Sequence, residues 1–134
     1  MQLDALIGRI VLGIKGISYL PAEEEGSELS LEGLEFILEN SESLSFTAGT
    51  NWALRVEKGE WPGLPRWCYP SGSWQYSDVH PLAVELSSRV CNVEKHINAL
   101  AELTGVDVQF ENGSRVSVTS GRVFTVMFIP ASVS

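Results

Sequence analysis

Two cysteines and two histidines are the side chains in this sequence best suited to metal or nucleophilic chemistry. Cys68, His80, Cys91 and His96 stand at intervals that match no common zinc site. The serines of the PSGS sequence do not form a nucleophile elbow, and neither a phosphate-binding glycine loop nor a dinucleotide fingerprint is present. The 17 acidic residues could include a catalytic pair, but no position singles one out. We therefore expect no metal, no cofactor and no enzymatic activity.

Negative charge is concentrated in one segment. The net charge is −8, and no basic residue stands between Lys15 and Arg55. Such a segment would be repelled by nucleic acid and by anionic membranes, and attracted to a basic protein partner. It is either a solvated loop or a partner-binding surface. The glutamates that we expect to steer a partner are Glu23, Glu24, Glu25 and Glu28.

Residues 60–76 form a second unusual segment, rich in aromatic residues and proline. Proline excludes a regular strand or helix there, so we expect an aromatic loop. Exposed aromatics with an arginine are typical of binding hot spots, whereas buried ones would close an open end of the sheets like a lid. Both interpretations stay open. The candidate anchors are Trp61, Arg66, Trp67, Tyr69 and Trp74.

The elements that must position these segments follow from an internal repeat. A shift of 72 residues aligns Leu31–Val56 with Leu103–Phe128 without a gap, and the two stretches share an Glu-Asn turn and a Thr-x-Gly break. Apolar residues alternate with polar ones in both, which is typical of half-buried strands. The same shift maps Ile10, Leu12 and Ile14 onto Leu82, Val84 and Leu86 as a leading strand of each copy.

The sequence therefore predicts a single mainly β (α+β) domain over 1–134. Two related antiparallel meanders, within 6–58 and 79–130, would be joined by the 60–76 loop and would form a sandwich or a partly open barrel. The first copy should have strands near 33–39, 43–48 and 52–57. The spacing of Val93, Ile97, Leu100 and Ala101 predicts one helix near 93–103, capped by Asn92.

The N-terminal apolar stretch reads as the first strand rather than as a signal peptide. Arg9 and Lys15 interrupt it, and it is too short and too charged to span a bilayer. With no export signal, Cys68 and Cys91 are expected to be reduced thiols rather than a disulfide. These features favour a cytoplasmic protein.

The pattern LEFILENS, LSFT and WALRV between Leu34 and Val56 resembles small bacterial proteins that are grouped with the immunity proteins of polymorphic-toxin and contact-dependent inhibition systems. The stretch 106–128 is similar, with Phe124 in place of Trp52. The resemblance covers both meanders and leaves the leading strands and the aromatic loop unmatched. It implies a cytoplasmic inhibitor that binds one toxin domain, without a reaction or a cofactor, and it assigns no functional residue.

Our leading hypothesis from the sequence is a non-enzymatic binding protein that neutralises a cationic toxin domain by charge and aromatic contact. A second hypothesis is a small-molecule-binding or enzymatic β-barrel whose pocket is lined by the tryptophan-rich loop. A third is a homodimer that pairs sheet edges.

Overall fold

The computed structural model describes residues 3–19, 31–49, 53–61, 63–65, 68, 74–78, 88–120 and 124–129. This part of the chain is all β apart from two 3-10 turns, η1 (Leu3–Leu6) and η2 (Glu39–Ser41). No helix in it is long and apolar enough to cross a membrane. The strands are β1 (Ile10–Tyr19), β2 (Leu31–Leu38), β3 (Ser43–Ala48), β4 (Leu54–Lys58), β5 (Trp74–Asp78), β6 (Ser88–Ile97), β7 (Leu103–Phe110), β8 (Arg115–Thr119) and β9 (Thr125–Ile129).

Eight strands form one antiparallel sheet that is not closed. Their order is β4-β3-β2-β1-β6-β7-β8-β9, and β5 is added to β1 outside this path. We call β1–β4 the first unit and β6–β9 the second unit; each is a meander of consecutive neighbours. Among the described residues, β1 and β6 pair the two units through a short ladder, with Ile10 opposite Arg89 and Val11 opposite Ser88.

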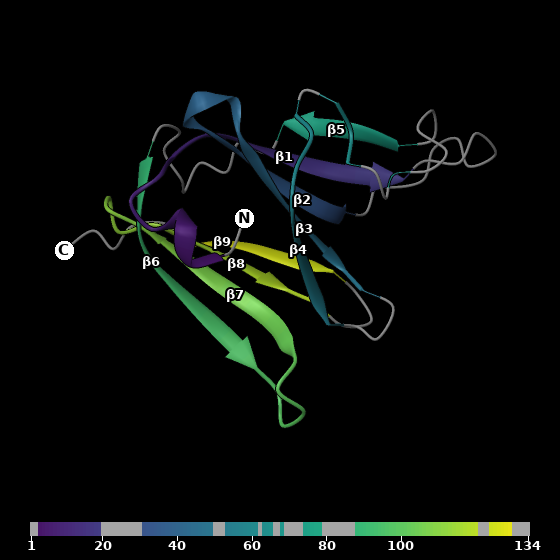
Figure 1. Ribbon diagram of the computed structural model, residues 1–134, viewed down its shortest axis with the longest axis vertical. Coiled ribbons are helices and arrows are strands. Elements are labelled where there is room, and N and C mark those ends of the chain that lie inside the picture. Colours follow the sequence, from purple (N-terminus) through teal and green to yellow (C-terminus); the bar gives the residue numbers. More distant parts are fainter. Residues whose placement is uncertain are drawn as a thin grey trace.

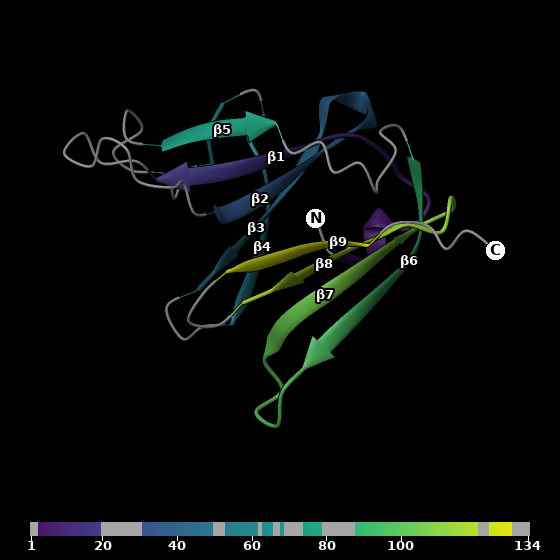
Figure 2. The same ribbon diagram turned by 180° about the vertical axis from the view of Figure 1, so that it is seen from behind.

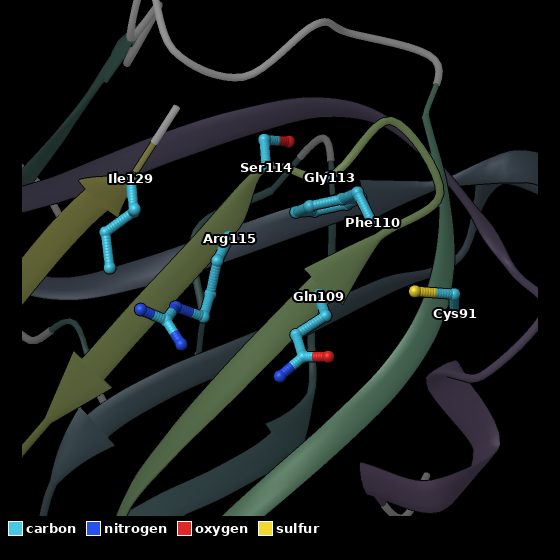
Figure 3. A pocket seen from close by; sticks show the side chains of 7 residues that line it. All are labelled: Cys91, Gln109, Phe110, Gly113, Ser114, Arg115 and Ile129. Atoms are coloured by element: carbon cyan, nitrogen blue, oxygen red, sulfur yellow. The ribbon is translucent and has the colours of Figure 1, made fainter. Parts of the chain in front are cut away.

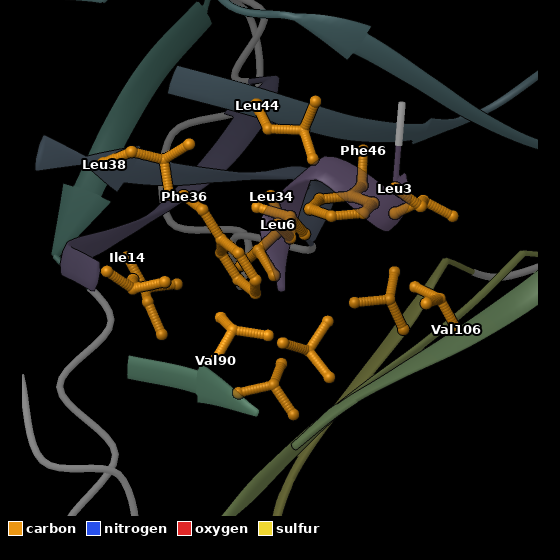
Figure 4. Packing of buried hydrophobic residues seen from close by; sticks show 14 of the residues in the cluster. Leu3, Leu6, Ile14, Leu34, Phe36, Leu38, Leu44, Phe46, Val90 and Val106 are labelled. Carbon is orange, nitrogen blue, oxygen red and sulfur yellow. The ribbon is translucent and has the colours of Figure 1, made fainter. Parts of the chain in front are cut away.

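The two units face each other across a common core (Figures 1 and 2). Phe36 and Phe46 of the first unit pack with their ring centroids 5.2 Å apart, and Val106 and Val118 of the second unit belong to the same buried cluster. Leu3 and Leu6 of η1 also enter this cluster (Figure 4). The alternation of apolar residues in each strand explains this arrangement, because each meander has one apolar face to bury.

The second and third strands of the two units pair in the same register. Leu34 lies opposite Phe46 in the first unit, and Val106 lies opposite Val118 in the second. All five recorded pairs of β2 with β3 recur between β7 and β8 at an offset of 72 residues. For these two strands the gapless alignment of the sequence therefore describes the same backbone pairing in both units.

The leading strands are also equivalent, but at an offset of 79. Ile14 lies opposite Phe36, and Val93 lies opposite Val108. Both strands carry a register shift near their start, between Val11 and Gly13 in β1 and between Val90 and Asn92 in β6, and a second one near their end. The mapping of the first strand onto 82–86 is thus wrong by seven residues, and 82–86 lie outside the described residues.

The helix predicted near 93–103 is wrong, because β6 covers Ser88–Ile97 and β7 begins at Leu103. The register shift before Asn92 inserts one extra residue, so Val90 and Val93 turn to the same side although they are three residues apart. The predicted helical face is instead divided between β6, which contains Val93 and Ile97, and the turn after it, where Leu100 and Ala101 are exposed. A bulge is defined by the pairing between two strands, so the local sequence does not indicate it.

The fourth strand shifts once more. Val56 lies opposite Phe46, and Val126 lies opposite Val118, so Val56 and Val126 are equivalent at an offset of 70. The shift of 72 matches Leu54 with Val126 instead, which is wrong by two residues. The strands expected near 33–39, 43–48 and 52–57 are β2, β3 and β4, which begin and end at most two residues away. Loops of different length account for the changing offset, because they can grow without disturbing the strands.

Candidate functional site

Most of the predicted anchors lie outside the described residues: Glu23, Glu24, Glu25, Glu28, Arg66, Trp67 and Tyr69. Trp61 and Trp74 are described, and both are half-buried. Trp74 is the first residue of β5, which pairs with the outer edge of β1. The segment expected to be an irregular loop therefore contains a strand at its end, although proline precedes it.

The described part of this connector covers the outer face of the first unit. Ile17, Ile37 and Cys68 are buried, yet they do not belong to the cluster between the units. Pro65 is buried as well. These side chains form a second, smaller apolar layer on the side of the sheet that faces away from the core.

A buried carboxylate lies beneath the connector. Glu35 is completely inaccessible to solvent, and the Ser43 hydroxyl donates a hydrogen bond of 2.6 Å to its Oε2 atom. The Tyr76 hydroxyl forms a short hydrogen bond with Oε1 of the same carboxyl group and lies 2.8 Å from the Gly63 carbonyl oxygen. These partners satisfy a group that is costly to bury alone.

Glycine at position 59 makes room for this carboxylate. A Cβ atom at Gly59 would overlap both Glu35 Oε2 and Ser43 Oγ. The Gly59 amide donates to the Ser43 carbonyl oxygen at 2.9 Å, which begins the path of the connector over the sheet. The close approach of backbone and carboxylate explains why no side chain fits here.

Aromatic and cationic groups close the site from outside. The rings of Trp61 and Tyr76 meet edge to face with centroids 5.4 Å apart, and Lys15 Nζ lies 5.2 Å from the Trp61 ring centroid. Such an arrangement suits the quadrupole of the indole ring. For Trp61 and Tyr76 the structure therefore supports the covering role, while each residue remains partly exposed at the surface.

The Tyr76 hydroxyl group and the Cys68 thiol of this cluster are held in their neutral forms. Burial raises the pKa of Tyr76 well above its usual value, and the hydrogen bond to Glu35 and its charge raise it further. Burial, and then the charge of Glu35, raise the pKa of the Cys68 thiol to about 11. A thiol in this state is a poor nucleophile. We conclude that the cluster stabilises the connector.

The equivalent position in the second unit has different partners. Asp107 occupies the position of Glu35, and its Oδ2 atom lies 3.2 Å from Nε2 of His96. Burial alone would raise the pKa of Asp107, but hydrogen bonds from Ser117 and His96 and the charges of His96 and Arg115 outweigh it, so the pKa is lowered. The sequence reasoning matched Glu35 with Asp107 but did not select either as a site residue.

The second unit also contains a depression of about 360 Å³ (Figure 3). The Nε atom of Arg115 is buried there without a hydrogen-bond partner, while the Cys91 side chain is exposed. The expected pocket lined by the tryptophan-rich loop is not this one, since its walls come from the second unit alone. They are formed by Cys91, Gln109, Phe110, Gly113, Ser114, Arg115 and Ile129.

Cys68 and Cys91 are free thiols, one buried and one exposed. His80 lies outside the described residues, and within them no group of three or more His, Cys, Asp or Glu side chains is arranged to hold a metal ion. The chain matches no family model, no curated protein and no solved structure.

Proposed function

We propose that this chain is a non-enzymatic binding protein of the immunity type, which neutralises a basic toxin domain through an acidic and aromatic surface. The observation that carries the proposal is the pairing of Tyr19 with Trp74. The chain enters the acidic segment 20–30 after Tyr19, and it leaves the aromatic connector at Trp74. Paired strands lie about 5 Å apart.

The return of the chain strengthens this relationship. Leu31, where β2 begins, lies opposite Ser18, so both ends of the 20–30 segment are anchored at the same end of β1. The offset between the two units is 79 for the leading strands and 72 for the second strands. The difference of seven residues is the extra length of the connection between β1 and β2 compared with that between β6 and β7. Glu23, Glu24, Glu25 and Glu28 all belong to this longer connection.

Charge would speed the encounter with a basic partner, and aromatic side chains would supply most of the affinity. Among the described cations, Arg9 contacts Glu39 of η2, Arg55 contacts Glu57 of β4 and Lys95 contacts Asp4 of η1, so acidic residues outside the 20–30 segment balance these charges. Trp61, Trp74 and the connector residues Arg66, Trp67 and Tyr69 are the proposed anchors.

The test uses the protein encoded beside the gene for this chain as the candidate toxin. Co-expression of this chain should restore growth that the neighbouring protein abolishes. Stopped-flow association at low salt should then be at least about tenfold slower after Glu24→Lys with Glu25→Lys, with a flatter salt dependence. The control is Glu102→Lys with Glu111→Lys, which makes the same charge change in the second unit. A harmless neighbour, or equal association rates for the two double variants, contradicts the proposal.

Binding of a small molecule is the second candidate function, and the unpartnered Arg115 Nε in the depression of the second unit supports it. A guanidinium group in a cavity of this size suits a small carboxylate or phosphate. A panel of such anions should raise the melting temperature of the wild-type chain and leave that of Arg115→Met unchanged. An equal response of both proteins rules this candidate out.

A further inference from the structure

We propose that the open edge of β6 at Glu94–Ile97 binds an extended basic segment of a partner protein, which adds to the sheet as an antiparallel strand. The proposal goes beyond the function above, because it concerns a different surface. Figure 1 places the Tyr19 end of β1 and the Ile97 end of β6 on different sides of the molecule.

The first unit shows how such an edge is used. β5 pairs antiparallel with β1, with Asp78 opposite Lys15 and Trp74 opposite Tyr19. At the offset of 79 that relates the leading strands, the edge at residues 15–18 corresponds to the edge at 94–97 in β6. The chain thus fills this edge in one unit with a strand of its own.

The corresponding edge of the second unit is unoccupied by any described strand. β6 pairs with β7 on one side, and on the other it meets β1 only at Ser88 and Arg89. Every residue from Glu94 to Asn98 is exposed, including Ile97 at 54%. An exposed edge strand presents backbone groups that pair readily with another strand.

The 3-10 turn η1 lies near this strand without covering it. Lys95 Nζ contacts Asp4 Oδ2 at 3.1 Å, and Lys95 pairs with the core residue Val106, which puts this ion pair on the inner side of the sheet. Both of its members remain partly exposed. The outer side of the edge, with Glu94 and His96, is free of this contact.

Charge identifies the partner. In the first unit Lys15 lies directly opposite Glu35 of β2. The equivalent of Lys15 in the second unit is Glu94, which lies directly opposite Asp107. The Glu94 side chain is exposed, and a cationic side chain on an added strand would lie opposite it and pair with its carboxylate. The partner strand is therefore expected to carry lysine or arginine opposite Glu94.

The outer face beside this edge can receive such a strand. In the first unit Tyr76 pairs with Ile17, and Ile17 pairs with Gly33 on its other side. The hydroxyl group of Tyr76 reaches Glu35, two residues after this glycine. The second unit keeps a glycine at the equivalent position, Gly105, with His96 in place of Ile17. A guest side chain opposite His96 would lie beside the His96–Asp107 pair.

A capped nine-residue peptide of alternating lysine and valine serves as the probe. At saturation it should slow hydrogen exchange of amides within 94–97 at least about tenfold, because a pairing strand removes them from water. Glu94→Lys should weaken binding of this peptide at least about tenfold, whereas the control Glu32→Lys should change it less than about twofold. Should Glu94→Lys fail to fold, Glu94→Gln replaces it with a smaller expected loss.

Two further peptides separate strand pairing from simple charge attraction. A lysine–glycine peptide of the same charge should bind at least about tenfold more weakly, since glycine disfavours an extended strand. A glutamate–valine peptide should not bind. Equal binding of the lysine–valine and lysine–glycine peptides, or protection away from 94–97, overturns the proposal and leaves the acidic and aromatic surface at Tyr19 and Trp74 unaffected.

Discussion

Glu35 and Asp107 occupy the same position in the two units of the sheet. Glu35 lies opposite Ser45, and Asp107 lies opposite Ser117, with an offset of 72 in both strands. Glu35 is fully buried beneath the connector, while 15% of the Asp107 side chain is exposed. One backbone position thus supports a sealed structural cluster in one unit and an accessible polar face in the other.

Substitution of Gly59 should test how tightly the connector is packed on Glu35. Gly59→Ala places a methyl group where the Glu35 and Ser43 oxygens lie, and we expect a loss of about 3 kcal/mol in the free energy of unfolding, measured in urea. Gly13→Ala is the matched control, because its Cβ would meet only Ile37 at 3.9 Å. Equal stability of the two variants would show that the connector does not lie against Glu35.

Tyr76 should make the stability of the fold sensitive to alkaline pH. Its pKa is higher in the folded chain than in the unfolded chain, where it is about 10. The stabilisation is therefore complete below about pH 10 and is lost as the pH rises further. Between about pH 10 and 11.5 the free energy of unfolding should fall more steeply with pH for the wild type than for Tyr76→Phe. The difference in slope should correspond to the release of at most about one proton on unfolding. Parallel curves for the two proteins would contradict this expectation.

The two thiols should differ strongly in reactivity. With a pKa of about 11, only about one in a thousand Cys68 side chains is a thiolate at pH 8, and burial restricts access further. We expect the exposed Cys91 to react with a disulfide reagent at least about 100-fold faster than Cys68. Cys91→Ser should remove the fast phase, and urea should make both thiols reactive. A fast phase that survives Cys91→Ser would place Cys68 at the surface.

Asp107 should stabilise the second unit at neutral pH and lose this effect in acid. Its lowered pKa means that the contribution is complete above the unfolded value of about 4 and disappears as the pH falls through the lower folded value. Asp107→Asn should cost about 1 kcal/mol at pH 7 and flatten the loss of stability between about pH 4 and 2. A steep acid profile in Asp107→Asn would locate the titrating group elsewhere.

The pairs β2–β3 and β7–β8 could be predicted from the sequence because their period-2 alternation and their turns are local. Phe46 and Val118 belong to this class, and both are fully buried as expected. The strand β6 could not be predicted in this way. Its register shift at Cys91 brings Val90 and Val93 to one side, and only the pairing with β7 reveals it.

The sequence by itself determined the repeated alternation, the acidic excess before Arg55 and the aromatic composition of 60–76. Tertiary structure alone decided that Tyr76 covers Glu35, that His96 contacts Asp107 instead, and that Tyr19 meets Trp74. The physical reason is the difference between local and long-range interactions. Alternation and charge are properties of neighbouring residues, whereas burial and pairing depend on which distant segment lies across the sheet, and the two units differ mainly in that respect.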